Sequence, residues 1–138
     1  MKNTLFRIID ANLNRSREGL RVCEDIARLV LGDKSISGSL KRIRHSATNA
    51  LLFSKKMPLK RLVLTRNTKT DALKKVDFDK KNKSLIADLF MSNIERVKES
   101  LRVIEECTKP LDKNISRKYR KLRFDAYDIE KKAIGKVC

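Results

Sequence analysis

The chain has 138 residues, the length of one ordinary domain with a hydrophobic core of its own. Its 34 Lys and Arg residues outnumber 17 Asp and Glu residues, and the formal net charge of +17 predicts an anionic partner such as nucleic acid, a membrane surface or a phosphorylated small molecule. No run of 18 apolar residues occurs, which excludes an ordinary transmembrane helix, and the first residues do not have the pattern of a signal peptide.

Three cysteines without a C-x-x-C spacing indicate neither a disulfide framework nor a zinc site, so we expect a protein of the reducing cytoplasm. Four glycines, two prolines and no tryptophan favour an all-α fold. The sequence has no Gly-rich phosphate loop and no H-E-x-x-H motif. His45 is the single histidine, and we interpret it as a partly exposed helix residue rather than a catalytic base.

Apolar or small residues recur every three or four positions in the first part of the chain, which is typical of a helix buried along one face. The pattern predicts a helix over residues 8–31. Gly32 is a natural end for it, because glycine adopts the left-handed C-terminal cap without a steric penalty. The expected buried stripe is Ile9, Leu13, Ser16, Leu20, Cys23, Ala27 and Val30.

The same spacing predicts three more helices. The second ends near Pro58, the third covers residues 85–108 and ends around Pro110, and the fourth follows it. The segment between the second and third helices, residues 57–84, is long for a compact domain, and such segments are more often functional than idle. Within it Leu62-Val63-Leu64 suggests a short extended piece. The expected core residues of the second and fourth helices are Ile36, Leu40, Ile43, Ala47 and Leu51, and Ile115, Tyr119, Leu122, Ala126 and Ile129.

Two parts of the chain repeat each other. Residues 12–25 (NLNRSREGLRVCED) and 93–106 (NIERVKESLRVIEE) are identical at 7 of 14 positions, and the likeness continues from Asp33 and from Asp112. An internal repeat dictates architecture. We therefore predict a single domain over residues 1–138, a bundle of four main helices built from two helical hairpins related by a pseudo-twofold axis. The repeats are expected over about residues 8–56 and 85–134, joined by the loop 57–84, with a possible site where the equivalent surfaces meet.

Two polar residues fall inside the apolar arc of the first helix. Asn12 and Arg15 lie there on a helical wheel, and Asn93 and Arg96 repeat the arrangement. A buried guanidinium needs a partner, because burial without one is prohibitive. Two alternatives are open for Arg15: an internal carboxylate such as Glu18 or Glu99, or the phosphate of a ligand.

The repeated segments also carry a resemblance. Residues 7–15 (RIIDANLNR), followed by REGLRV and Glu24-Asp25, resemble the opening signature of the helical hydroxymethylpyrimidine phosphate kinase family of thiamine biosynthesis. That domain occurs alone or at the N-terminus of some bacterial thiamine phosphate synthases. Residues 64–68 with Asp71 are similar to its central loop, and residues 93–106 to its second block, so the resemblance covers nearly the whole chain.

The resemblance implies an enzyme that phosphorylates hydroxymethylpyrimidine phosphate to the diphosphate with ATP and Mg²⁺. Such chemistry needs arginine clamps for phosphates and one or two carboxylates for the metal ion or the pyrimidine amine. The expected phosphate and substrate residues are Asn12, Arg15, Arg66, Asn93 and Arg96. The expected catalytic carboxylates are Asp10, Glu18, Asp71 and Glu99, and no metal ligands are assigned among them.

Two other interpretations stay open. The basic stretch from Arg117 to Arg123 could follow a nucleic-acid backbone, although glutamates lie among the arginines of both repeats and make this the weaker reading. The domain could also be a non-catalytic docking partner of thiamine phosphate synthase. The expected partners are the phosphorylated pyrimidine and ATP; no membrane partner is expected, and the synthase and a homo-oligomer are left open.

Overall fold

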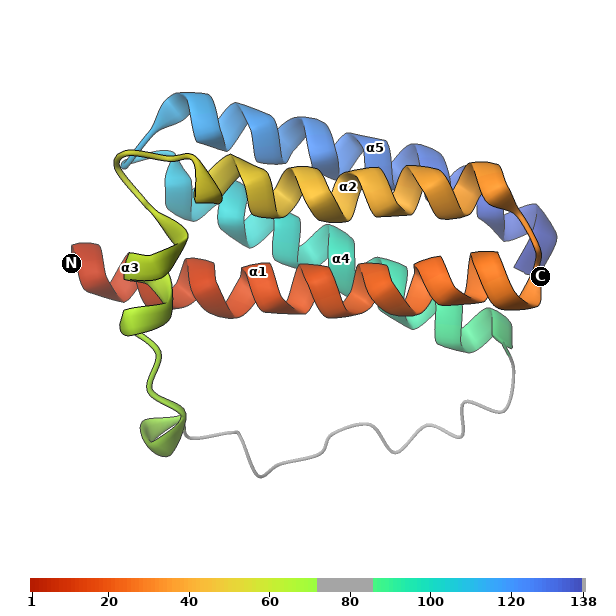
Figure 1. Ribbon diagram of the computed structural model, residues 1–138, viewed down its shortest axis with the longest axis horizontal. Helices are drawn as coiled ribbons and strands as arrows, with labels where there is room; N and C mark the ends of the chain where they lie inside the picture. The colour runs from red at the N-terminus through yellow and green to blue at the C-terminus, as the bar shows by residue number, and fades with distance from the viewer. Residues whose placement is uncertain (72–85, 138) are drawn as a thin grey trace.

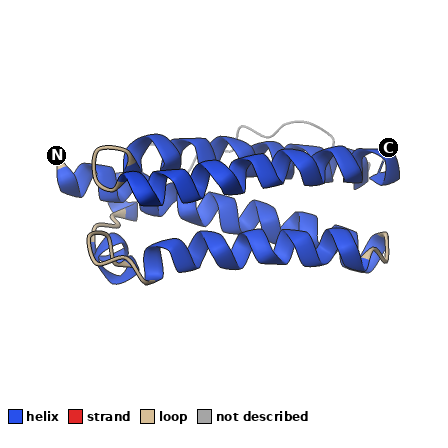
Figure 2. Cartoon of the chain, turned by 90° about the horizontal axis from the view of Figure 1, so that it is seen from above, coloured by secondary structure: helices blue, strands red, loops and turns tan. Residues whose placement is uncertain are grey.

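The described chain folds into a bundle of four long helices. The computed structural model describes residues 1–71 and 86–137, and these contain helices and loops but no strand (Figure 2). The long helices are α1 (Lys2–Asp25), α2 (Lys34–Leu52), α4 (Ile86–Thr108) and α5 (Lys113–Val137). Figure 1 shows them aligned along one axis, with α1 packed on α2 and α4, and α5 packed on α2 and α4. The prediction of an all-α bundle of four main helices is therefore confirmed.

Three short elements complete the described chain. A π-helical segment, η1 (Ile26–Val30), extends α1, and a short helix, α3 (Leu59–Leu64), lies against α1 (Figure 1). A 3-10 turn, η2 (Thr68–Thr70), follows. We call residues 59–71 the α3–η2 segment. No helix within residues 1–71 and 86–137 is long and apolar enough to cross a membrane.

The predicted stripes form the core with one exception. The expected core residues of α2 and α5 are buried, and those of α1 are buried from Ile9 to Ala27. The prediction that Val30 is buried is wrong, because this residue is 57% exposed. The π turn spaces its hydrogen bonds five residues apart, as in the bond from the Leu31 amide to the Ile26 carbonyl, and this takes Val30 off the α-helical stripe. Helix α1 also begins earlier than predicted, because Phe6 extends the buried face.

The helix ends agree with their sequence signals. Gly32 has a φ of +63°, and the Asp33 amide donates to the Ala27 carbonyl, which closes the end of η1, the extension of α1, as expected. The Asp33 carboxylate then accepts from the Ile36 amide at 2.9 Å and caps α2. In the second repeat Asp112 accepts from the Ile115 amide at 3.4 Å in the equivalent position.

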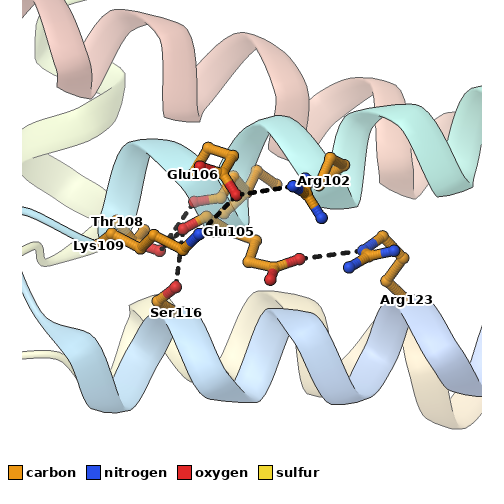
Figure 3. Close-up of polar contacts among 8 residues, drawn as sticks. Arg102, Glu105, Glu106, Thr108, Lys109, Ser116 and Arg123 are labelled. Carbon is orange, nitrogen blue, oxygen red and sulfur yellow. Dashed lines mark hydrogen bonds and ion pairs between the residues drawn. The ribbon is translucent and has the colours of Figure 1, made fainter.

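Each hairpin contains a buried Glu–Arg ion pair, and these two pairs are related by the repeat. Glu24 of α1 accepts two hydrogen bonds from Arg44 of α2, at 2.8 and 3.3 Å. Glu105 of α4 accepts from Arg123 of α5 at 3.0 Å, and Figure 3 shows this carboxylate reaching across the hairpin. Nearby, the Ser116 hydroxyl donates to the Glu105 carbonyl at 2.8 Å. The two repeats thus share this Glu–Arg contact between their helices as well as their sequence similarity.

The two repeats meet where α1 crosses α4. The Ser16 and Ser100 hydroxyl oxygens lie 2.6 Å apart, and a Cβ atom added to Gly19 would lie 2.9 Å from the Asn93 carbonyl oxygen and from Val97. The repeat offset of 81 residues places Ser16 on Val97 and Gly19 on Ser100, so each contact is the symmetry mate of the other. Reciprocal contacts of this kind are what a twofold relation requires.

One predicted element is wrong. Residues Leu62-Val63-Leu64 are helical rather than extended, because they form the second half of α3. Leu62 is fully buried against the bundle, whereas Val63 and Leu64 are exposed, so one side of a helical turn faces inward. The remainder of the predicted connecting loop from residue 72 onward lies outside the described residues.

Candidate functional site

An open cleft of about 920 Å³ lies between α1, the α3–η2 segment and one residue of α4. Its size is within the usual range for small-molecule sites. It brings together seven of the nine predicted site residues. Its lining residues are Thr4, Arg7, Ile8, Asp10, Ala11, Asn12, Asn14, Arg15, Glu18, Arg66, Asn67, Thr68, Thr70, Asp71 and Arg96.

The centre of the cleft is a bidentate ion pair between Asp10 and Arg66. The Arg66 Nε and Nη2 atoms each donate to an Asp10 oxygen at 2.8 Å. The Asp10 side chain is 5% exposed and that of Arg66 is 43% exposed. The hydrogen bond to Asp10 raises the pKa of the Arg66 guanidinium above its ordinary value, so Arg66 is charged at any physiological pH. The pair attaches the α3–η2 segment to α1.

Asn12 orients Arg15. The Asn12 side chain is buried, donates its amide to the Ile8 carbonyl at 2.9 Å and accepts from Arg15 Nη1 at 3.3 Å. The expectation that Arg15 lies in the apolar arc is wrong, because its side chain is exposed at the rim of the cleft. Within the described part of the chain it forms no ion pair with Glu18 or Glu99, and the internal-partner alternative finds no support there.

Arg96 approaches the same cleft from α4. It is the repeat equivalent of Arg15, and the two arginines flank the α1–α4 crossing. Neither Arg15 nor Arg96 has a carboxylate partner among residues 1–71 and 86–137. Two guanidinium groups without such partners, facing one cleft, make it suited to bind an anion.

The carboxylates of the cleft have different surroundings. Asp10 is held by Arg66, whereas Glu18 is exposed at the Arg15 end and Asp71 lies at the end of the α3–η2 segment. In the described residues no group of three or more His, Cys, Asp or Glu side chains could hold a metal ion by itself. Mg²⁺ is ordinarily held by one or two carboxylates together with substrate phosphates, and Glu18 and Asp71 fit that pattern.

Two predicted residues do not line the cleft. Asn93 donates its amide to the Leu89 carbonyl at 2.8 Å, as Asn12 does to Ile8, but its backbone carbonyl faces Gly19 in the helix crossing. Glu99 lies in a separate shallow groove with Glu95, Lys98, Arg102, Arg123 and Tyr127. Its repeat equivalent is Glu18, which lines the cleft.

The cleft is also lined by Thr4, Arg7 and Asn14, which are not among the predicted site residues. Arg7 lies three residues before Asp10 and eight before Arg15, so all three lie near one side of α1. That spacing alone does not single out a site, because polar and charged residues lie beside the buried stripe on any amphipathic helix. The remaining candidates have other surroundings: His45 is exposed on α2, and Cys23 is fully buried.

Comparison with known proteins relates the chain to thiamine biosynthesis. The model of the ThiD2 family matches residues 7–132. Thiamine-phosphate synthases match over nearly the whole chain: that of Prochlorococcus marinus (strain AS9601) is 34% identical over 127 residues, covering 91% of this chain and 34% of the relative. The synthase of Nostoc punctiforme is 29% identical over 136 residues, covering 98% and 37%. The synthase of Rhodopirellula baltica is 29% identical over 137 residues, covering 96% and 36%. The chain thus spans about a third of the length of these relatives, and no solved structure matches it.

Proposed function

Because the chain belongs to the ThiD2 family and is related to a part of thiamine-phosphate synthases, we propose that it phosphorylates hydroxymethylpyrimidine phosphate to the diphosphate, with ATP as the phosphate donor. The observation that carries the proposal is the presence of Arg15, Arg66 and Arg96, from three separate stretches of sequence, in one cleft. Transfer of a phosphoryl group to a monophosphate brings many negative charges together, and catalysis then depends on positioning and charge stabilisation.

The roles follow from the surroundings of each group. Arg15 and Arg96 would hold the phosphate of the pyrimidine, since both face the cleft without carboxylate partners in the described chain. Glu18 and Asn14, next to Arg15 on α1, would recognise the amino group and ring nitrogens of the pyrimidine. Bound Mg²⁺ would neutralise phosphate charge, held by the phosphates together with Glu18 or Asp71.

The test replaces arginine with lysine. Lysine keeps the charge but loses the planar fork that makes paired hydrogen bonds to phosphate. We expect Arg15→Lys or Arg96→Lys to lower turnover by at least about tenfold, roughly 1.4 kcal/mol of activation free energy. The measurement is ATP-dependent formation of hydroxymethylpyrimidine diphosphate, with circular dichroism as the folding control.

The matched control is Arg28→Lys, because Arg28 is an exposed arginine on η1 outside the cleft. It should leave turnover unchanged. Full turnover in both cleft variants would remove Arg15 and Arg96 from the site. Absence of turnover in the unmodified protein would instead favour a second function, a non-catalytic domain that docks with thiamine-phosphate synthase. What favours that alternative is the match of the whole chain to about a third of such synthases.

A further inference from the structure

The repeat is broken at one end of the cleft. With an offset of 81 residues, Arg15 is equivalent to Arg96, and both line the cleft. Arg7 is equivalent to Asp88, and Asp10 is equivalent to Met91, so neither has a chemical counterpart in the second repeat. The cleft therefore has a symmetric end, built from repeated arginines, and a unique end, built from residues present once.

The two ends are separated along α1. Arg7 and Arg15 are eight residues apart, which is about 12 Å along the axis at about 1.5 Å per residue. Between them Asp10 holds Arg66 through two 2.8 Å hydrogen bonds. Side chains on a helix lean toward its N-terminus, as Arg15 does where its Nη1 donates to Asn12 at 3.3 Å. Both guanidinium groups are then displaced in the same direction, so the separation along the axis is kept and favours one phosphate at each end over one phosphate shared by both.

The unique end of the cleft carries side chains suited to binding a longer anion. Arg7 has no ion pair with any carboxylate in the described chain, and three threonines, Thr4, Thr68 and Thr70, line the same cleft. Arg66, half-exposed beside the Asp10 carboxylate, presents a further cation. Hydroxyl donors with guanidinium groups are the usual partners of phosphate oxygens.

We propose that the cleft contains two anion subsites divided by the Asp10–Arg66 pair: Arg15 and Arg96 bind the monophosphate of the pyrimidine, and Arg7 binds the polyphosphate chain of the phosphate donor. The inference rests on the proposed function for the identity of the two ligands. It adds that donor and acceptor are held by different arginines.

Equilibrium binding measurements test the two proposed subsites without requiring that the protein turns over substrate. Isothermal titration calorimetry would measure the Kd of hydroxymethylpyrimidine phosphate and, separately, of the non-hydrolysable analogue AMP-PNP with Mg²⁺. Arg7→Gln should weaken AMP-PNP binding by at least about tenfold and change the binding of the pyrimidine phosphate less than about twofold; Arg96→Gln should do the reverse. Arg28→Gln is the matched control and should change neither.

Inorganic tripolyphosphate separates the contribution of the phosphates from that of the nucleoside. If Arg7 binds the polyphosphate chain, Arg7→Gln should weaken tripolyphosphate as it weakens AMP-PNP. An effect on AMP-PNP without one on tripolyphosphate would overturn the assignment of Arg7 to phosphate.

The remaining outcomes distinguish this inference from the proposed function. Equal weakening of both ligands by either variant, or no weakening by Arg7→Gln, would overturn the two subsites even if the protein turns over. Failure of the unmodified protein to bind either ligand would overturn them as well. A split in binding without turnover would leave the subsites standing and contradict the kinase.

Discussion

Asp10 is the residue on which the described geometry of the cleft depends. Its buried carboxylate holds Arg66, and this ion pair attaches the α3–η2 segment to α1. In Asp10→Asn the amide keeps the shape but loses the charge. We expect the segment to detach more often, at a cost of roughly 1 to 2 kcal/mol after discounting for the exposure of Arg66. Trypsin should then cut at Arg61 or Arg66 at least about threefold faster.

Asp128→Asn is the control for that experiment. Asp128 is exposed on α5 and forms no ion pair with any residue in the described parts of the chain. It should leave the cleavage rate unchanged. Equal cleavage rates in Asp10→Asn and the unmodified protein would show that Leu62, the buried residue of α3, holds the segment without help from the ion pair.

Cys23 should be chemically inert in the folded protein. Burial raises the pKa of its thiol to about 12, and the thiolate is the form that reacts with alkylating agents. Cys107 is half-buried, and burial also raises its pKa, but reagents can reach it. At pH 8 iodoacetamide should therefore modify Cys107 at least about tenfold faster than Cys23, as followed by peptide mass spectrometry. In denatured protein the two cysteines should be modified at comparable rates. Comparable modification rates in the native protein would contradict the packing around Cys23.

The sequence predicted which residues line the cleft better than it predicted their burial and their ion pairs. Asp10, Arg15 and Arg66 were selected and do line one cleft. The periodic pattern nevertheless placed Arg15 among buried residues, because a helical wheel treats a boundary position as part of the arc. Arg7 was missed because it lies outside the repeat. The pairing of Arg66 with Asp10, across 56 positions, has no local signal in the sequence.

At the scale of helices, the close approach of α1 to α4 depends on Gly19. An added Cβ would lie 2.9 Å from a backbone oxygen of Asn93, which cannot move as a side-chain tip can. We expect Gly19→Ala to lower the free energy of unfolding by about 1 to 3 kcal/mol, because the helices must separate. Urea denaturation would measure the change.

Gly38→Ala is the matched control, since its added Cβ would meet only an Arg42 side-chain atom at 3.8 Å within α2. There alanine should stabilise the protein by up to about 1 kcal/mol, as expected for an unstrained helix position. If Gly19→Ala were also stabilising, the described crossing distance would be wrong.

The long helices were predictable and the short ones were not. A stripe such as Ile36, Leu40, Ile43, Ala47 and Leu51 repeats the helical period often enough to identify the element. Three residues, Leu62 to Leu64, do not complete one helical turn, so periodicity cannot distinguish a helix from a strand there. The π segment was missed because no residue pattern separates it from the end of an α-helix.

At the scale of the molecule, the two hairpins carry equivalent ion pairs that should act independently. Arg44→Met would leave Glu24 buried without its main partner, and Arg123→Met would do the same to Glu105. Each should cost about 3 kcal/mol of unfolding free energy. Because the pairs share no residue, the double variant should lose the sum of the two costs in one cooperative transition. Two transitions would instead indicate that the hairpins unfold separately.

The net charge of +17 should affect the binding of a nucleic acid more than the binding of a phosphorylated pyrimidine. On α5, Tyr119 and Leu122 are buried and Arg123 is bonded to Glu105, so the basic stretch presents only part of its charge to solvent. A nucleic acid would use the exposed cations of this helix, whereas a phosphorylated pyrimidine in the cleft would not contact them.

Neutralising that surface separates the two partners. The quadruple variant changes Lys113, Lys118, Lys131 and Lys132 to Gln; all four are exposed on α5 and lie outside the cleft. Its net charge is 17 − 4 = +13. If the cleft is the functional site, the Kd for hydroxymethylpyrimidine phosphate should change less than about twofold, because screening makes distant exposed charges weak. Binding of an RNA oligomer to this surface would instead fall and lose part of its salt dependence, since fewer phosphates are neutralised. A large loss of pyrimidine phosphate binding in this variant would mean that diffuse charge, rather than the arginine cleft, attracts the ligand.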